Sequence, residues 1–481
     1  MARNQLNDNG SRGLIQRIAH SATAMTLANY LITWGYFLLL LPLAVRVFSV
    51  PDQALWLALS LVTSFGQVAD LGFRPTLVRA FAWACATRRH EDNIEPQSVS
   101  TPTPDIHRLL NTAAHIYRLL FAVALVPSMT VGYLVCRNIV PQTQSIPLSW
   151  TSVALAALTG SVAIVAGLWS GLLEGTDRVA EASRYNALLG VLRLVAGIIV
   201  IASGLGVAAF AAVNLLIALI TWLLMRHLGL RRISSLGVSR DIYPIWDRDI
   251  LRFLWPPTWR SGCIRVGALL VQQGSSIAVS QISDVRLISS YLLTIKGLSA
   301  LSYFTQVTIA AKLPQINHLR VLRRTAELVN LVVPKIRTSL GITIFALVAA
   351  SLVGNPLLAI IGGKSTILTG PVYWALVISL VLETHQNLHA TVYMTTNHVP
   401  FWAPSLISGA LIVGASMIAT SRYGVWGMVL PRLLIPLMFN NWYSVVLNIR
   451  SLNMKFGEYL RRLVGKRIYS VGSRLLSYDS V

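Results

Sequence analysis

Long apolar stretches recur along the whole chain and are separated by short polar segments. Each stretch is about 20 residues long, which is the length that an α-helix needs to cross the hydrocarbon core of a bilayer. Segments of about 10 residues with alternating polarity, which would indicate a transmembrane barrel, are not seen. The pattern predicts an all-α membrane protein with about twelve transmembrane helices. The expected spans are residues 22–45, 53–73, 110–136, 150–173, 185–204, 206–227, 257–282, 286–311, 338–361, 371–394, 401–420 and 425–447.

The composition agrees with a membrane protein and indicates no enzyme. Of the 481 residues, 54% are hydrophobic and only 12% are charged, and the mean hydropathy is +0.61. A soluble domain would carry about 25% charged residues. The chain has no GxxxxGK[ST] phosphate loop, no GxSxG nucleophile elbow and no HExxH metal motif. We therefore expect a transporter rather than an enzyme, with no catalytic residue and no cofactor.

The net charge of +22 is explained by membrane topology. Lys and Arg gather near the N-terminus and in the segments 74–108, 231–252, 312–335 and 450–474, whereas the alternate loops hold few. Cytoplasmic loops of membrane proteins carry such an excess of positive charge. This rule places both termini in the cytoplasm, which requires an even number of spans, and it leaves no reason to expect a nucleic-acid partner.

The polar segment RRISSLGVSRDIYPIWDRDILR divides the spans into two groups of six. Two similar groups of helices are typical of transporters whose halves move about a central site. The predicted organisation is a cytoplasmic N-terminal segment (1–21), an N-lobe with spans one to six (22–227), a cytoplasmic inter-lobe linker (228–256), a C-lobe with spans seven to twelve (257–449) and a basic cytoplasmic tail (450–481).

The stretch PPTWRSGCIRVGALLVQQGSSIAVSQ in span seven carries two arginines within a helix that should lie in hydrocarbon. A charge there costs about 3 kcal/mol or more and needs a partner. Arg260 can extend toward cytoplasmic water, but Arg265 lies eight residues beyond Pro257, about 12 Å into the membrane. Lys296 in span eight is close to the midplane. We expect Arg265 to be balanced by cavity water, by Glu383 and by an anionic ligand.

Cationic residues within the spans outnumber the acidic ones, which favours a water-filled cavity that receives an anion. Arg193, Arg118 and Arg432 are further buried cations, although each could equally form a structural pair or reach a helix end. Gln272 and Gln273 could bond sugar hydroxyls or tie two helices together. The candidate substrate-binding residues are Arg265, Lys296, Arg193, Arg118, Arg260, Gln272 and Gln273.

The segment ETHQNLHAT in span ten places Glu383, His385 and His389 within two helical turns. Carboxylates and imidazoles titrate when they are partly buried, so these residues are candidates for coupling transport to an ion gradient. The two histidines are four residues apart, a spacing that can chelate a metal, but no third ligand is evident and we expect no metal site. Hydrogen bonding between helices is an equally good interpretation of the histidines.

Four segments together resemble the O-antigen and exopolysaccharide (Wzx-like) flippases of the multidrug/oligosaccharidyl-lipid/polysaccharide exporter superfamily. They are ADLGFRPTLVRAFAWA, GLLEGTDRVAEASRYNALLGVLR, SSYLLTIKGLSALSYFTQVTIAAKLPQINHLR and LVLETHQNLHATVYMTTNHVPFWAPSLISG. The resemblance implies a MATE-like fold with two six-helix lobes around a V-shaped cationic cavity. It also implies alternating access in the bacterial inner membrane, which moves an undecaprenyl-diphosphate-linked oligosaccharide from the cytoplasmic to the periplasmic leaflet. The insert HEDNIEPQSVSTPTPD departs from the family pattern.

The expected partners are the lipid bilayer and the lipid-linked oligosaccharide, with a polysaccharide polymerase and glycosyltransferases as candidate protein partners. A multidrug exporter of the same superfamily is the main alternative, but it would need acidic residues around its cavity, and only Glu383 qualifies. A membrane polymerase or ligase would present a large extracytoplasmic loop, and the sequence shows none.

Overall fold

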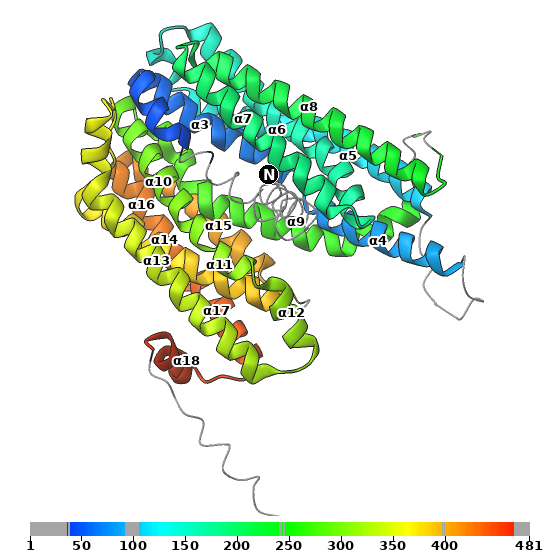
Figure 1. Ribbon diagram of the computed structural model, residues 1–481. Helices are drawn as coiled ribbons and strands as arrows, with labels where there is room; N and C mark the ends of the chain where they lie inside the picture. The colour runs from blue at the N-terminus through cyan, green and yellow to red at the C-terminus, as the bar shows by residue number, and fades with distance from the viewer. Residues whose placement is uncertain are drawn as a thin grey trace, which may run out of the picture.

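The structure is a computed structural model that describes residues 36, 39–91, 105–239, 243, 246–396, 398 and 400–465. Within this part of the chain all regular structure is helical (Figure 1). After a helical segment over 39–47, the first half contains α3 (Val50–Val68), α4 (Phe73–Glu91), α5 (Ile106–Cys136), η1 (Val140–Gln142), α6 (Ile146–Gly175), α7 (Val179–Ala202) and α8 (Gly206–Ser235). The second half contains α9 (Arg248–Ile277), η2 (Ala278–Gln281), α10 (Val285–Thr305), α11 (Val307–Ala310), α12 (Leu313–Val321), α13 (Thr325–Ile360), α14 (Gly370–Met394), α15 (Trp402–Tyr423), α16 (Val425–Met438), α17 (Asn440–Ser451) and α18 (Phe456–Leu463).

The helices confirm an all-α multi-pass membrane protein. Among the described residues, seven helices are long and apolar enough to cross a bilayer, or eight if the bent pair formed by α3 and α4 is one span. The sequence predicts twelve. The other four predicted spans fall on α9 and α14, which carry more polar side chains, on α16 with α17, which break at Phe439, and on 22–45, much of which lies outside the described residues.

The predicted boundaries between lobes stay a prediction. Helix α8 continues to Ser235 and α9 already begins at Arg248, so the predicted linker 228–256 is helical at both of its ends. Asp247 caps α9, because its side chain accepts hydrogen bonds from the backbone N–H groups of Asp249 and Ile250. It also accepts from Arg108 of α5, which ties the start of α9 to the first half.

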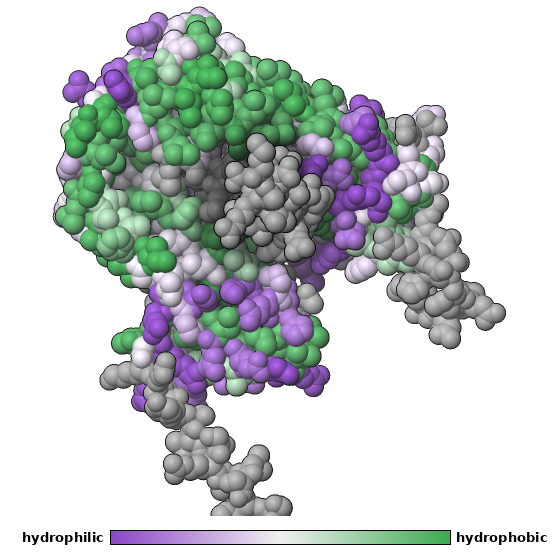
Figure 2. Space-filling view, viewed as in Figure 1, coloured by the Kyte–Doolittle hydropathy of each residue, from purple (hydrophilic) through white to green (hydrophobic). Residues whose placement is uncertain are grey.

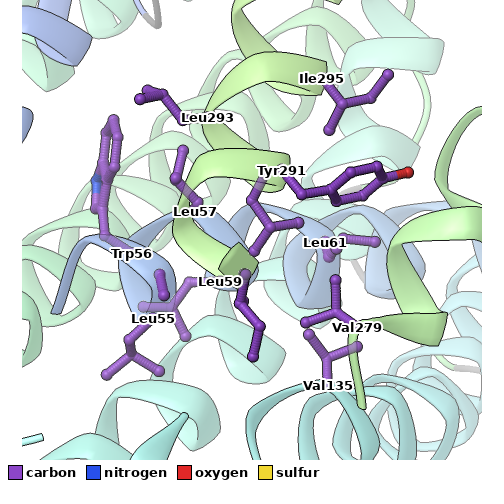
Figure 3. Close-up of a cluster of buried hydrophobic side chains, with 14 of the residues drawn as sticks. Leu55, Trp56, Leu57, Leu59, Leu61, Val135, Val279, Tyr291, Leu293 and Ile295 are labelled. Carbon is purple, nitrogen blue, oxygen red and sulfur yellow. The ribbon is translucent and has the colours of Figure 1, made fainter. Parts of the chain in front are cut away.

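The two halves share one hydrophobic core at one end of the molecule. Leu57 and Leu61 of α3 and Val135 of α5 pack in one cluster with Tyr291 and Ile295 of α10 (Figure 3). All five side chains are buried. Burial of large apolar side chains contributes about 1.5–3 kcal/mol each. The shared core is therefore what joins the halves.

At the opposite end the halves have separate cores. One core gathers buried residues of α4, α5, α6, α8 and the start of α9, and another gathers residues of α12, α13, α14, α17 and α18. Hydrophilic side chains collect around α12 and α17 at this end, whereas hydrophobic side chains cover the helices farther up (Figure 2). The basic segments 231–239, 246–252 and 312–335 also belong to this end, which the positive-inside rule predicts to be the cytoplasmic one.

Polar contacts close the shared-core end. Asn138, next to η1, donates from Nδ2 to the carbonyl oxygens of Ser280 (2.8 Å) and Ile282 (3.0 Å). Gln142 donates from Nε2 to the carbonyl oxygen of Ser283 at 3.0 Å. Since these bonds join the α5–α6 loop to the α9–α10 loop, they hold the two halves together on the extracytoplasmic side.

The break between α3 and α4 presses against α9. Leu71 and Gly72 both adopt positive φ, 48° and 78°, and the two helices meet at 41°. A Cβ on Gly72 would lie 2.6 Å from Ser261 Cβ, and a Cβ on Gly262 would lie 2.6 Å from the Leu71 carbonyl oxygen. Glycine is needed at Gly72 for both the backbone conformation and the contact. This contact places Asp70 beside α9.

The crossing of α9 and α15 also depends on glycine. A Cβ on Gly409 would lie 2.6 Å from Leu270 Cβ and 2.9 Å from the Gly267 carbonyl oxygen. A Cβ on Gly267 would in turn lie 2.5 Å from the Ser405 carbonyl carbon. Small residues at such crossings let membrane helices approach closely, and packing is then a main source of their association.

We expect Gly409→Val to lower the free energy of unfolding by about 1–3 kcal/mol, because the side chain must push α15 away from α9. Gly414→Val is the matched control in the same helix, since a Cβ there has nothing within 4 Å. Thermal unfolding of both variants in detergent measures the difference. Equal stability of the two variants would contradict the close crossing.

Candidate functional site

A cavity of about 420 Å³ lies between the first half and α9. Its wall comes from α6, α7, α8, the α3–α4 break and α9. The charged lining residues are Asp70, Arg74, Arg193 and Arg265, and the polar uncharged ones are Tyr36, Gln67, Ser170, Asn186 and Thr221. The structure therefore brings together two of the predicted cations, Arg193 and Arg265, and adds Arg74 to them.

Arg265 is balanced by Asp70 rather than by Glu383. The distance from Arg265 Nη1 to Asp70 Oδ2 is 3.6 Å, and the side chains are 44% and 7% exposed. Asp70 also accepts hydrogen bonds from Tyr117 Oη at 2.7 Å and from the Arg74 backbone N–H at 3.3 Å. The prediction that Glu383 neutralises Arg265 was wrong, because Glu383 lies in another network. Asp70 is held by buried partners, while Arg265 reaches into the cavity.

Arg74 has a carboxylate partner of its own. Its Nη2 donates to Glu174 Oε1 at 2.6 Å. Asp70 and Glu174 are not among the candidate residues of the sequence analysis. The signal for Asp70 is the motif ADLGF, where a glycine that breaks the helix follows an acid by two residues. No sequence feature shows that the break faces Arg265.

Arg193 of α7 is the least satisfied cation of the cavity. Within the described residues no carboxylate pairs with it, and its Nε is buried without a hydrogen-bond partner. Arg193 also borders a second cavity of about 200 Å³, which shares Tyr36 and Gln67 with the first. This second cavity adds the hydroxyl and amide groups of Ser60, Thr63, Thr159 and Asn214.

The two cavities together provide a cationic region beside a region of neutral hydrogen-bonding groups. Three arginines and one carboxylate line the larger cavity, so its charge is positive. A buried arginine with free N–H groups fits an oxyanion, because the guanidinium can bond two oxygens at once. Hydroxyl and amide groups fit sugar hydroxyls, with which they can exchange hydrogen bonds.

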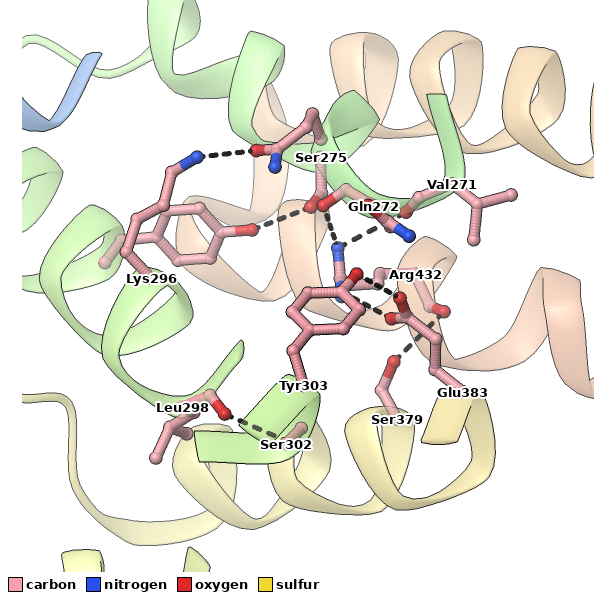
Figure 4. A network of polar contacts seen from close by, with 12 residues as sticks. Val271, Gln272, Ser275, Lys296, Leu298, Ser302, Tyr303, Ser379, Glu383 and Arg432 are labelled. Atoms are coloured by element: carbon pink, nitrogen blue, oxygen red, sulfur yellow. Dashed lines mark hydrogen bonds and ion pairs between the residues drawn. The ribbon is translucent and has the colours of Figure 1, made fainter. Parts of the chain in front are cut away.

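Lys296 does not line either cavity. It belongs to a polar network in the second half (Figure 4), where its Nζ donates to Gln273 Oε1 at 3.0 Å. Among the described residues no carboxylate forms an ion pair with Lys296. The structure thus separates the two residues that the sequence analysis grouped together, because Arg265 faces the first half and Lys296 faces α9 from α10.

Arg432 and Glu383 form the buried centre of this network. Arg432 Nη2 and Glu383 Oε2 are 2.8 Å apart, and the side chains are only 2% and 10% exposed. Arg432 Nη1 also donates to the backbone carbonyl oxygens of Val271 and Gln272, and Tyr303 Oη donates to Glu383 Oε1 at 3.1 Å. This is the structural pair that the sequence analysis left open for Arg432. It joins α9, α10, α14 and α16.

His385 and His389 bond the same phenol. Tyr459 Oη of α18 lies 2.7 Å from His385 Nε2 and 2.9 Å from His389 Nε2. Asn448 Nδ2 lies 2.9 Å from His389 Nδ1, so His389 donates from Nε2 to the phenol, which donates to His385. Burial raises the pKa of Tyr459, which keeps the phenol protonated. No group of three metal-ligating side chains occurs in the described part of the chain.

The remaining candidates lie elsewhere. Arg260 is exposed and its guanidinium lies 5.5 Å from the ring centroid of Trp259. Gln272 contributes its carbonyl oxygen to Arg432. Arg118 is exposed and borders a groove on the outer surface of the first half. None of the three lines the central cavity in the described residues.

The chain matches no known protein-family model and no curated protein in sequence. Its fold matches solved structures of transporters. An inward-facing multidrug-resistance MATE transporter of the MOP superfamily has a TM-score of 0.52 and 14% identity over 91% of this chain and 99% of that chain. The lipid II flippase MurJ, in an inward closed conformation, has a TM-score of 0.56 and 10% identity over 94% of this chain and 90% of that chain.

A third structure is a MOP-superfamily transporter from Pyrococcus furiosus, described as having a binding pocket of reverse polarity. It has a TM-score of 0.52 and 16% identity over 91% of this chain and 98% of that chain. Likeness at such low identity reflects shared architecture rather than shared function. The chain therefore has the all-α, multi-pass fold of the MOP-superfamily transporters.

Proposed function

We propose that this protein is a secondary transporter that flips an undecaprenyl-diphosphate-linked oligosaccharide from the cytoplasmic to the periplasmic leaflet of a bacterial inner membrane. The product would serve surface polysaccharide synthesis. The observation that carries the proposal is the positive charge of the cavity. Arg193 lacks any partner among the described residues. Arg265 forms a 3.6 Å ion pair with Asp70, and 44% of its side chain stays exposed. A diphosphate supplies the missing anion.

The position of the cavity suits a lipid-linked substrate. The halves share one core at the predicted extracytoplasmic end, whereas two distinct cores occur at the predicted cytoplasmic end, so the cavity would receive its ligand from the cytoplasmic side. The phosphates would meet Arg193 and Arg265, and the sugars would meet hydroxyl and amide groups such as Thr63 and Asn214. Breaking the Asn138 and Gln142 contacts would then open the periplasmic side.

A multidrug exporter remains the alternative, since one structural neighbour is a multidrug transporter. Cationic drugs would need a negative cavity, because opposite charges attract and like charges repel at close range. Among the described residues, Asp70 is the one carboxylate that lines the larger cavity, and it is already bonded to Tyr117 and paired with Arg265. The charge of the cavity therefore favours an anionic substrate.

The protein partners expected for a transporter of such a substrate are a polysaccharide polymerase and glycosyltransferases.

Glu383, His385 and His389 remain the candidates for ion coupling. The carboxylate of Glu383 is balanced internally by Arg432, and the histidines are engaged with Tyr459 and Asn448. Coupling through Glu383 would thus require the ion pair to open during transport. A structural role requires only that it stay closed.

The proposed function is tested in bacterial cells that lack this protein. We expect polyprenyl-diphosphate-linked oligosaccharide to accumulate with its sugar accessible only from the cytoplasmic face, and the intact chain to restore surface polysaccharide. The accessibility of the sugar to a lectin or a glycosidase on inverted and right-side-out vesicles measures the orientation. Unchanged polysaccharide together with greater sensitivity to cationic dyes would overturn the proposal in favour of drug export.

We expect Arg193→Gln and Arg265→Gln to lower transport by about 10- to 100-fold each, because each removes a charged hydrogen bond worth about 1.5–3 kcal/mol to the substrate. Arg422→Gln is the control, because this exposed arginine at the end of α15 is not among the residues that line the cavity. Membrane abundance of all three variants is compared by immunoblot. Normal transport by both cavity variants would remove the basis for an anionic substrate.

The Glu383–Arg432 pair is tested by a double-mutant cycle. Glu383→Gln should lower the free energy of unfolding by about 3–5 kcal/mol, because Arg432 is left buried and unpaired. The double variant with Arg432→Gln should be less destabilised than the sum of the single variants. Thermal unfolding gives the coupling energy, and strictly additive effects would show that the two side chains do not interact.

A further inference from the structure

A second concave site lies on the outer surface of the first half. This groove has a volume of about 330 Å³, and α5, α6 and α8 form it. Its lining residues are Arg118, Phe121, Val162, Val165, Leu219 and Trp222. On α6 the central cavity is lined instead by Ala163, Ile164, Ala166, Gly167 and Ser170. The groove and the central cavity are therefore separate sites on α6.

The surroundings of the groove show that it faces the bilayer. Val123 on α5 is 57% exposed, and Leu216 and Leu223 on α8 are 55% and 54% exposed. Apolar side chains that are exposed on helices of a membrane protein contact lipid chains rather than water. A ligand of this groove would thus come from the membrane.

The cations of the groove lie at the edge of the hydrocarbon layer. Residues 119–136 of α5 and 206–225 of α8 contain no Asp, Glu, Lys or Arg, and Arg118 and Arg226 stand at the same end of these stretches. That end leads into the basic segments, so it faces the cytoplasm. The Arg226 guanidinium lies 6.0 Å from the ring centroid of Trp222, and tryptophan is the residue typical of the membrane interface.

The polar groups of the groove lack protein partners. Among the described residues Arg118 makes no hydrogen bond or ion pair, and no carboxylate lines the groove. The indole Nε1 of Trp222 is buried without an acceptor in the same part of the chain. A guanidinium at the membrane edge can extend to the headgroup layer, where a lipid phosphate can bond it. A phosphodiester provides two oxygens in the spacing that a guanidinium prefers.

The floor of the groove is apolar. Phe121, Val162, Val165 and Leu219 extend from Arg118 toward the uncharged part of the helices. This wall matches a hydrocarbon chain, which would be held there by van der Waals packing, because a chain that comes from the bilayer is already out of water. One molecule that joins a phosphate to such a chain satisfies both parts of the groove.

We propose that this groove is a binding site for an anionic phospholipid of the cytoplasmic leaflet. The phosphate bonds Arg118, the positive charge of Arg226 adds to the attraction, and one acyl chain lies over Phe121, Val165 and Leu219. Such a lipid would fill the surface between α5 and α8 without entering the central cavity. The proposal does not depend on which molecule the protein transports.

The first test compares lipid binding by the full chain and by Arg118→Gln, with phosphatidylglycerol as the probe. Native mass spectrometry of protein released from nanodiscs counts the lipids that remain bound. We expect Arg118→Gln to bind the most tightly held phosphatidylglycerol at least tenfold more weakly, with no change for phosphatidylcholine. Arg286→Gln on α10 is the matched exposed control and should bind like the wild type. Equal phosphatidylglycerol binding by wild type and Arg118→Gln would overturn the proposal.

A second variant tests the acyl-chain part of the groove and leaves Arg118 in place. Val165→Phe fills the apolar floor and should also weaken phosphatidylglycerol binding at least tenfold, and circular dichroism confirms that its helices form. If inorganic phosphate competed with the bound lipid at millimolar concentration, the groove would be a simple anion site and the proposal would fail. It would also fail if Arg118→Gln lost a co-purified lipid-linked oligosaccharide but kept phosphatidylglycerol, since the groove would then serve the substrate. Failure of the proposed function alone would leave both lipid measurements unchanged.

Discussion

A positive charge within a membrane protein needs a partner, and this requirement organises the polar groups of the whole structure. Arg432 is almost fully buried and is satisfied by Glu383 and by two backbone carbonyl groups. Arg74 is paired with Glu174. In the part of the chain that the structure describes, Arg265 pairs only with the more distant Asp70, and Arg193 has no carboxylate partner. The arginine in the core of the second half has a close carboxylate partner within the protein, whereas Arg193 and Arg265 in the central cavity do not. An anion from outside the protein would therefore bind most favourably in the cavity.

The packing of the helices determines where that cavity can exist. One hydrophobic core joins both halves at the end predicted to be extracytoplasmic, so in this conformation the halves are held together there. The glycine contact between the α3–α4 break and α9 brings a carboxylate of the first half to an arginine of the second. Asp70 and Arg265 consequently lie at the junction of the halves. A movement of one half relative to the other would change the distance between these two side chains.

The sequence was sufficient for the all-α membrane fold but not for the pairs of side chains. Apolar stretches and the distribution of Lys and Arg depend on one dimension, depth, and they predicted the all-α membrane fold correctly. Pairing depends on the rotation of each helix and on its neighbours. Depth alone suggested that Glu383 meets Arg265, whereas the packing of α14 against α16 places it with Arg432.

The same reasoning explains why Asp70 was missed. It stands at a helix break, and sequence analysis treats such positions as close to water. In the structure the break is covered by α9, and Tyr117 of α5 donates to the carboxylate, so that Asp70 is only 7% exposed.

Arg193 and Arg118 border different cavities beside α6. The surroundings of each cavity determine which kind of anion the arginine can bind. Arg193 faces the interior side, where polar hydroxyl and amide groups accompany it and the enclosed space is large enough for a hydrated ligand. Arg118 faces the outer side, where its neighbours are apolar and the surrounding medium is lipid. Both are unpaired among the described residues, but the first is suited to a phosphate that carries sugars and the second to a phosphate that carries acyl chains. Under the two proposals, one bundle of helices would keep the transported lipid apart from the bound phospholipid.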